Sequence, residues 1–70
     1  MRLTIKGIDG IFKVNNILIL LEEANIMKSL LKADHGVGYM NIDFDDVEPY
    51  NLYWLIKDIT KLNVTITFGD

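Results

Sequence analysis

The sequence predicts an α/β (α+β) domain of two layers, in which a four-stranded mixed sheet carries two helices on one face. Three observations favour this fold. Every strand-like segment alternates apolar with polar residues, so each predicted strand buries only one of its faces. Two longer segments repeat their apolar residues at helical spacing. In chain order the elements follow the pattern ββαβαβ, with both helices on the same face of the sheet.

The length of the chain, 70 residues, indicates a single compact domain spanning residues 1–70. A domain of this size buries about 60% of the surface that its unfolded chain exposes, so its core is small. The sequence is 50% hydrophobic and has no cysteine, which excludes disulfides and thiolate metal sites as supports for that core. We therefore expect part of the apolar surface to be buried between two copies in a homodimer.

The first predicted element is a β-hairpin over residues 2–14. Apolar residues alternate with polar ones in this segment, and Asp9-Gly10 is a dipeptide favoured in two-residue type I′ turns. The competing interpretation starts the first helix near Ile11.

The first helix is predicted from about Ile17 to about Ala33, with Asn15 or Asn16 as its N-cap and Gly36 as a left-handed residue at its end. It carries two apolar stripes. One stripe is expected to pack on the sheet. The other contacts either the second helix or a second subunit, and we assign it as a candidate dimer interface: Ile19, Ile26 and Leu30.

The second half of the chain is predicted as strand, helix and strand. The strand covers Tyr39 to Asp45. The helix follows, because Asp45 and Glu48 have the spacing of a capping box and Pro49 is tolerated in a first helical turn. The last strand runs from Val64 to Phe68.

The charge of the chain bears on the class of its partners. The net charge is −3 and the pI about 4.9, which argue against direct binding of nucleic acid. Residues 1–33 carry a net charge of +2, whereas residues 34–70 carry −5. This asymmetry favours a basic partner for the second half of the chain, although ordinary solubilising charge would produce it as well.

An acidic run supplies the strongest candidate site. Asp43, Asp45, Asp46 and Glu48 fall where a strand ends and a helix begins. Such carboxylates can stabilise a helix N-terminus, but Asp43 lies too early in the strand for that role. We therefore interpret the run as an anionic surface for a basic protein, in which carboxylates take the place of DNA phosphates.

A metal-dependent activity is the main alternative for the same residues. Mg²⁺ takes oxygen ligands, so the cluster of Asp43, Asp45 and Asp46 could support phosphoryl transfer or nuclease-like chemistry. The segment Asp-x-Asp-x-Val also resembles the nucleophile motif of haloacid-dehalogenase-type phosphohydrolases. That resemblance implies Asp43 as nucleophile and Asp45 as acid/base, but the later motifs of that family find no room here.

Three aromatic residues form the second candidate site. Tyr50, Tyr53 and Trp54 fall outside the core stripe of the second helix, beside Lys57 and Lys61. Tyrosine and tryptophan are enriched among the residues that dominate binding energy at protein interfaces. We expect these rings either to bind a partner or to be covered by the rest of the chain.

No residue pattern commits the chain to catalysis, and we expect a protein without enzymatic activity and without a cofactor. The only histidine, His35, is predicted to lie solvated at a helix end, with no nucleophile beside it in a recognised motif. No signal peptide and no membrane-spanning run is evident, so we expect a cytoplasmic location.

In size, composition and charge asymmetry the whole chain resembles the small, acidic, cysteine-free early proteins of lytic phages that act against host factors. This resemblance implies a dimeric inhibitor that acts as a DNA mimic in the host cytoplasm. Its partner would be a basic host protein, such as a nucleoid-associated or replication protein. A structural subunit of a larger assembly is a further alternative, in which the stripe of Ile19, Ile26 and Leu30 matters more than the acids.

Overall fold

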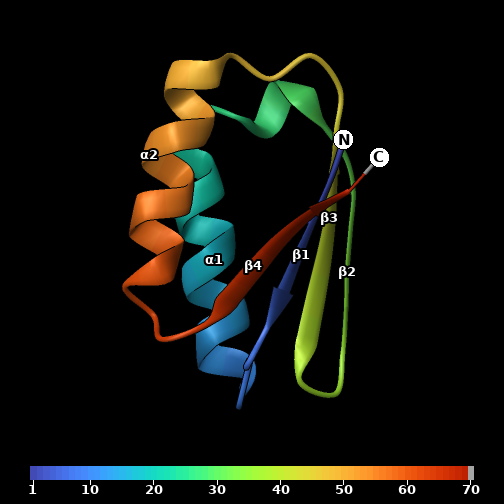
Figure 1. The fold of residues 1–70 in the computed structure, drawn as a ribbon, viewed down its shortest axis with the longest axis vertical. Coiled ribbons are helices and arrows are strands. Elements are labelled where there is room, and N and C mark those ends of the chain that lie inside the picture. The colour runs from blue at the N-terminus through green and yellow to red at the C-terminus, as the bar shows by residue number, and fades with distance from the viewer. Residues whose placement is uncertain (70) are drawn as a thin grey trace.

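The computed structural model describes residues 1–69 as four strands, two α-helices and one short 3-10 helix (Figure 1). In chain order these are β1 (Arg2–Lys6), α1 (Ile11–Glu23), η1 (Met27–Ser29), β2 (Leu30–Gly36), β3 (Tyr39–Phe44), α2 (Pro49–Thr60) and β4 (Thr65–Gly69).

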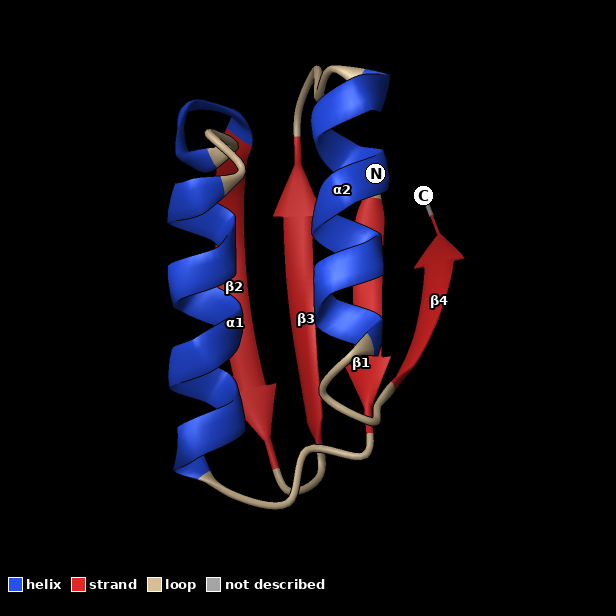
Figure 2. Ribbon diagram, turned by 90° about the vertical axis from the view of Figure 1, so that its left-hand side faces the viewer, coloured by secondary structure: helices blue, strands red, loops and turns tan. Residues whose placement is uncertain are grey.

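The strands form one sheet in the order β2-β3-β1-β4, and every neighbouring pair is antiparallel. Both helices lie on one face of this sheet and leave the other face open, as Figures 1 and 2 show. The predicted two-layer arrangement with four strands and two helices is therefore confirmed. The predicted mixed sheet and the ββαβαβ order are wrong, because the sheet is antiparallel and the order is βαββαβ.

The βαββαβ order creates two interleaved units. The strands of the first unit, β1 and β2, are separated by β3, and the strands of the second, β3 and β4, are separated by β1. This is the split βαβ topology of ferredoxin-like folds. Because that topology supports many unrelated activities, function has to be argued from the surfaces of this particular chain.

The core lies between the sheet and the helices, and its strand residues come from the two central strands. Burial follows the alternation expected for one-sided strands, with Leu3 and Ile5 in β1 facing the helices. The edge strands β2 and β4 contribute no fully buried residue. The buried apolar residues are Leu3, Ile5, Ile8, Val14, Ile17, Leu21, Ile26, Met40, Ile42, Phe44, Leu55 and Ile59.

The predicted N-terminal hairpin is wrong, because residues 11–14 begin α1 as the competing interpretation held. After β1 the backbone turns at Gly7, whose φ is +91°, and the amides of Gly7 and Ile8 donate to Gly38 O at 3.0 and 3.2 Å. These bonds lead the chain toward the β2–β3 loop instead of back along β1. Val14 and Ile17 are then buried at helical spacing.

The first helix ends ten residues earlier than predicted. Asn25 takes a left-handed conformation with φ +58°, and its N–H donates to Glu22 O at 3.0 Å. The N–H of Ile26 donates to Leu21 O at 3.3 Å, and both of these apolar side chains are buried. This pair of bonds is the Schellman motif, with asparagine in the position that glycine usually holds.

Residues 30–33, predicted as the end of that helix, form the edge strand β2 together with residues 34–36. Gly36 is consequently a strand residue and no helix cap, and His35 lies on a strand and not at a helix end. The glycine with positive φ in this part of the chain is Gly38, with φ +83°, in the two-residue loop between β2 and β3. The remaining elements agree with the predicted strand, helix and strand to within a few residues. No helix within residues 1–69 is long and apolar enough to cross a membrane.

Candidate functional site

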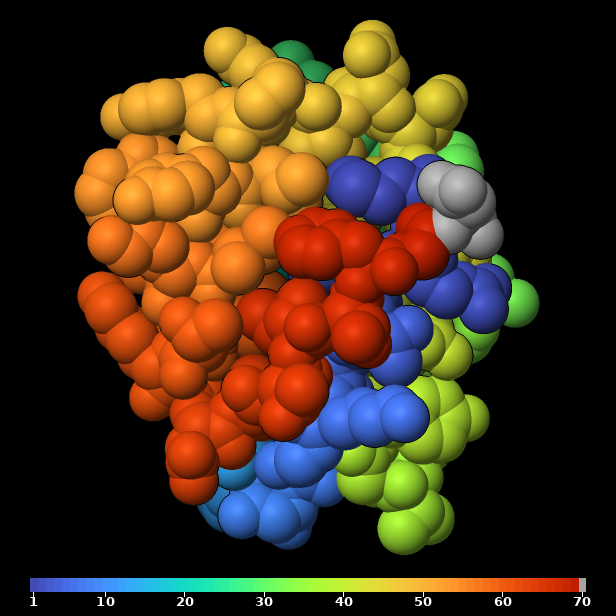
Figure 3. Space-filling model, viewed as in Figure 1, coloured from blue at the N-terminus to red at the C-terminus, as the bar shows by residue number. Residues whose placement is uncertain are grey.

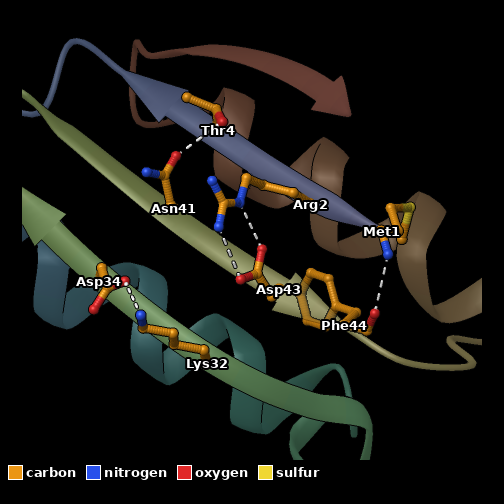
Figure 4. A network of polar contacts seen from close by, with 8 residues as sticks. All are labelled: Met1, Arg2, Thr4, Lys32, Asp34, Asn41, Asp43 and Phe44. Atoms are coloured by element: carbon orange, nitrogen blue, oxygen red, sulfur yellow. Dashed lines mark hydrogen bonds and ion pairs between the residues drawn. The ribbon is translucent and has the colours of Figure 1, made fainter. Parts of the chain in front are cut away.

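Asp43 lies on the open face of the sheet, whereas the other residues of the acidic run lie in the loop after β3. Asp43 in β3 lies directly opposite Arg2 in β1, and the guanidinium donates two hydrogen bonds to the carboxylate, at 2.7 and 3.1 Å (Figure 4). The hydrogen bond from Arg2 lowers the pKa of Asp43 below its ordinary value and raises that of Arg2. Asp43 therefore forms a cross-strand ion pair between β1 and β3, and its charge is largely matched within the chain.

The other three carboxylates of the acidic run, those of Asp45, Asp46 and Glu48, are exposed in the loop between β3 and α2. Within the described part of the chain no ion pair involves any of them. The loop is fixed by Ser29 of η1: its O accepts from the Asp45 N–H at 2.8 Å, and its Oγ donates to Asp46 O at 3.3 Å. Three unmatched charges are thus held on an anchored loop.

The capping box predicted from Asp45 and Glu48 is wrong. The N-cap of α2 is Glu48 itself, and its side chain makes no capping hydrogen bond. The helix begins at Pro49, whose missing N–H needs no partner in the first turn. Asp46 takes a left-handed turn conformation with φ +55°, so the residues before Glu48 belong to the loop. Their carboxylates are free for contacts outside the chain.

The aromatic residues lie on the exposed side of α2. Tyr50, Tyr53 and Trp54 are 68%, 56% and 46% exposed, so the rest of the chain leaves them uncovered. The Trp54 ring contacts the Tyr50 and Tyr53 rings edge-on, with centroids 6.4 and 5.5 Å apart. Lys57 Nζ lies 5.4 Å from the Tyr53 ring centroid and 5.6 Å from that of Trp54. These contacts order the rings without burying them.

The acidic loop and the aromatic residues belong to one surface. The loop leads directly into α2, and both are visible together on one side of the molecule in Figure 3, the loop in yellow and α2 in orange. We call this the acidic-aromatic surface. It consists of Asp45, Asp46, Glu48, Tyr50, Tyr53 and Trp54.

The predicted dimer stripe does not exist as one helical face. Ile19 is on α1 and 52% exposed, but Ile26 follows the helix and is 2% exposed, within the core. Leu30 begins β2 and packs partly buried against the core. The early end of α1 at its Schellman motif explains the difference, because it removes two of the three residues from the helix.

Sequence reasoning missed Arg2 as a residue that shapes these surfaces. Arg2 matches Asp43 only because β3 pairs with β1, a long-range register that no local pattern reveals. Lys57, which the sequence places beside the aromatic residues, is spaced four and three residues from Tyr53 and Trp54, and this helical spacing brings its ammonium group close to both rings.

The described residues, 1–69, contain no group of three or more His, Asp or Glu side chains placed to hold a metal ion. The carboxylate of Asp43, the nucleophile in the phosphohydrolase alternative, is occupied by the Arg2 guanidinium. The geometry therefore offers no observation in favour of the metal-dependent alternative.

Comparison with known proteins adds no relative. The chain matches no protein-family model, no curated protein and no solved structure at a significant level.

Proposed function

We propose that this protein is an interaction module that binds a basic protein through its acidic-aromatic surface. The observation that carries the proposal is the joint exposure of three ordered aromatic rings beside three carboxylates that form no ion pair within residues 1–69. Exposed tyrosine and tryptophan provide large contact areas with few rotatable bonds. The carboxylates would attract the partner and orient it, and salt would weaken that contribution.

The finer proposal is that the bound surface is the DNA-binding surface of a host protein, so that the module blocks binding of DNA. The acidic loop would occupy positions that phosphates otherwise take, and the rings would bury apolar area at the edge of that contact. Since Asp43 is matched by Arg2, we assign the contact to Asp45, Asp46 and Glu48. A nucleoid-associated or replication protein in the cytoplasm is the partner class that fits.

The test compares two triple variants of equal charge. Asp45→Asn/Asp46→Asn/Glu48→Gln removes three carboxylates from the acidic-aromatic surface, and Asp9→Asn/Glu22→Gln/Glu23→Gln removes three from outside it. Each would be immobilised beside the native protein, bacterial lysate applied and bound proteins eluted with rising salt. We expect the native protein and the control to retain the same basic DNA-binding protein, and the first variant to lose it.

The captured protein is then titrated against the native chain with labelled duplex DNA present. Trp54 is the only tryptophan and lies within the surface, so its fluorescence reports contact when the partner lacks tryptophan. We expect displacement of DNA by the native chain and weaker displacement by Trp54→Ala. Retention that is equal for both triple variants, or binding that leaves DNA in place, would contradict the corresponding proposal.

A further inference from the structure

The free edge of β2 is the longest unpaired strand edge of the sheet. β2 spans seven residues, whereas the opposite edge strand β4 spans five. Figure 2 shows β2 at one side of the sheet, with α1 over it. None of its residues is buried, and Leu31 is 68% exposed. An uncovered edge presents backbone donors and acceptors that can pair with another strand.

The hydrogen bonds of β3 show which residues of β2 direct their N–H and C=O groups toward the free edge. The Phe44 N–H donates to Met1 O at 2.9 Å and Phe44 O accepts from the Met1 ammonium at 3.2 Å, so Phe44 directs both groups toward β1. Directions alternate along a strand, so Ile42 also faces β1. Ala33 lies opposite Ile42 and therefore directs its own N–H and C=O away from β3, as His35 does by the same alternation.

The charges on β2 favour a second copy of the same strand as its partner, in one particular register. Lys32 and Asp34 lie on the open face of the sheet, on either side of Ala33, and are paired with Asp43 and Asn41 of that face. In an antiparallel pair of two identical strands centred on Ala33, Lys32 of each copy lies opposite Asp34 of the other. Centring the pair on Lys32 or Asp34 instead places like charges opposite each other, which is destabilising.

We propose that two copies of this chain associate through β2, antiparallel and with Ala33 opposite Ala33, to form a continuous eight-stranded sheet. Ala33 of each copy then supplies both N–H and C=O groups to the new ladder, as a hydrogen-bonded pair requires. Two Lys32–Asp34 pairs between the copies replace the exposed pair within each chain, in which Lys32 Nζ lies 3.3 Å from the carboxylate. A two-fold axis perpendicular to the sheet keeps both α1 helices on the same side.

On the helix-facing side of this edge, His35 lines a hollow between the start of α1 and the β2–β3 loop, whose walls include the apolar side chains of Ile8, Ile11 and Val14. The residues that set the proposed register, 32–36, lie where β2 pairs regularly with β3, because the irregularity of that pairing is confined to the step between Leu30 and Lys32.

This interface differs from the predicted stripe of Ile19, Ile26 and Leu30 and does not depend on the proposed function. Its test is a charge-reversal series in sedimentation equilibrium, with far-UV circular dichroism to confirm folding. The native chain is expected to dimerise. Asp34→Lys is expected to weaken dimerisation by about tenfold or more, because two attractive pairs become repulsive. Glu23→Lys, a reversal on the α2 side of α1, is the matched control and is expected to leave the dimer unchanged.

The exchange of both charges gives the decisive result. Lys32→Asp/Asp34→Lys restores opposite charges in the proposed register and is expected to dimerise like the native chain. Lys32→Asp and Asp34→Lys, each weak alone, are expected to form a mixed dimer when combined. A native chain that stays monomeric at millimolar concentration would overturn the proposal. A dimer indifferent to Asp34→Lys would also overturn it and would indicate pairing through β4 or through Ile19.

Discussion

β2 and β3 are the two strands of one hairpin, yet they differ in burial. β3 lies between two other strands and buries Met40, Ile42 and Phe44, whereas β2 lies at the edge and buries no residue. The difference shows that the position of a strand in the sheet determines whether its side chains enter the core. The central strand contributes side chains to the core, whereas the edge strand leaves backbone donors and acceptors unpaired on one side.

The largest expected effect comes from Met40 and its cross-strand partner His35. Met40 is 1% exposed and His35 is exposed on the edge. We expect Met40→Ala to lower the free energy of unfolding by about 2–5 kcal/mol, through lost burial and the cavity left behind. His35→Ala is expected to change it by less than about 0.5 kcal/mol. Urea denaturation measures both, and losses of equal size would break the comparison.

A substitution in the loop that joins β2 and β3 is expected to have a smaller effect on the free energy of unfolding, because it acts through backbone conformation alone. Gly38 has φ +83°, and a Cβ there would meet no atom within 4 Å. Gly38→Ala is therefore expected to lower the free energy of unfolding by about 1–2 kcal/mol through conformational strain only. Gly69→Ala, also with open space and without a positive φ, is the control and is expected to change it by less than about 0.5 kcal/mol. Equal losses for both variants would argue against strain at the loop.

The smallest effect concerns the carboxylates of the open face. Arg2 lowers the pKa of Asp43 in the folded state, so this ion pair stabilises the fold above the unfolded pKa of about 4 and is lost as pH falls through the folded pKa. Asp43→Asn is expected to lower the urea midpoint slightly at pH 7. Between pH 5 and pH 2 the urea midpoint of this variant is expected to fall less than that of the native chain. A native dependence in Asp43→Asn would show that the central pair contributes nothing.

Part of the candidate site was readable from sequence because its signal is local. Helical spacing placed Tyr50, Tyr53 and Trp54 off the core stripe, and the structure leaves them exposed. The acidic run was also evident from the sequence, but the sequence did not show that Asp43 is paired within the chain while the other carboxylates of the run are not. Whether Asp43 belongs with the free carboxylates depends on Arg2, which is 41 residues away in the chain.

The first half of the chain misled sequence reasoning because its local signals conflict. Asp9-Gly10 favours a hairpin turn, but the backbone leaves β1 at Gly7 and bonds to Gly38 instead. The apolar spacing after residue 23 continued the helical pattern, so the left-handed Asn25 that stops α1 was overlooked. A tertiary contact thus overrode the preference of Asp9-Gly10 for a turn. Asn25 is a weaker signal for a helix end than glycine, so Gly36 was the residue expected to end the helix.

The sequence by itself determined the two-layer arrangement of four strands and two helices, and it located the last strand, helix and strand of the chain to within a few residues, because alternation and helical spacing are unambiguous there. Only the tertiary structure decided that residues 11–14 are helical, that residues 30–36 form a strand and that β1 pairs with β3 and β4. Short apolar segments fit either a helix or a strand in isolation. Their choice is made by which arrangement buries them together, and that energy belongs to contacts between distant residues.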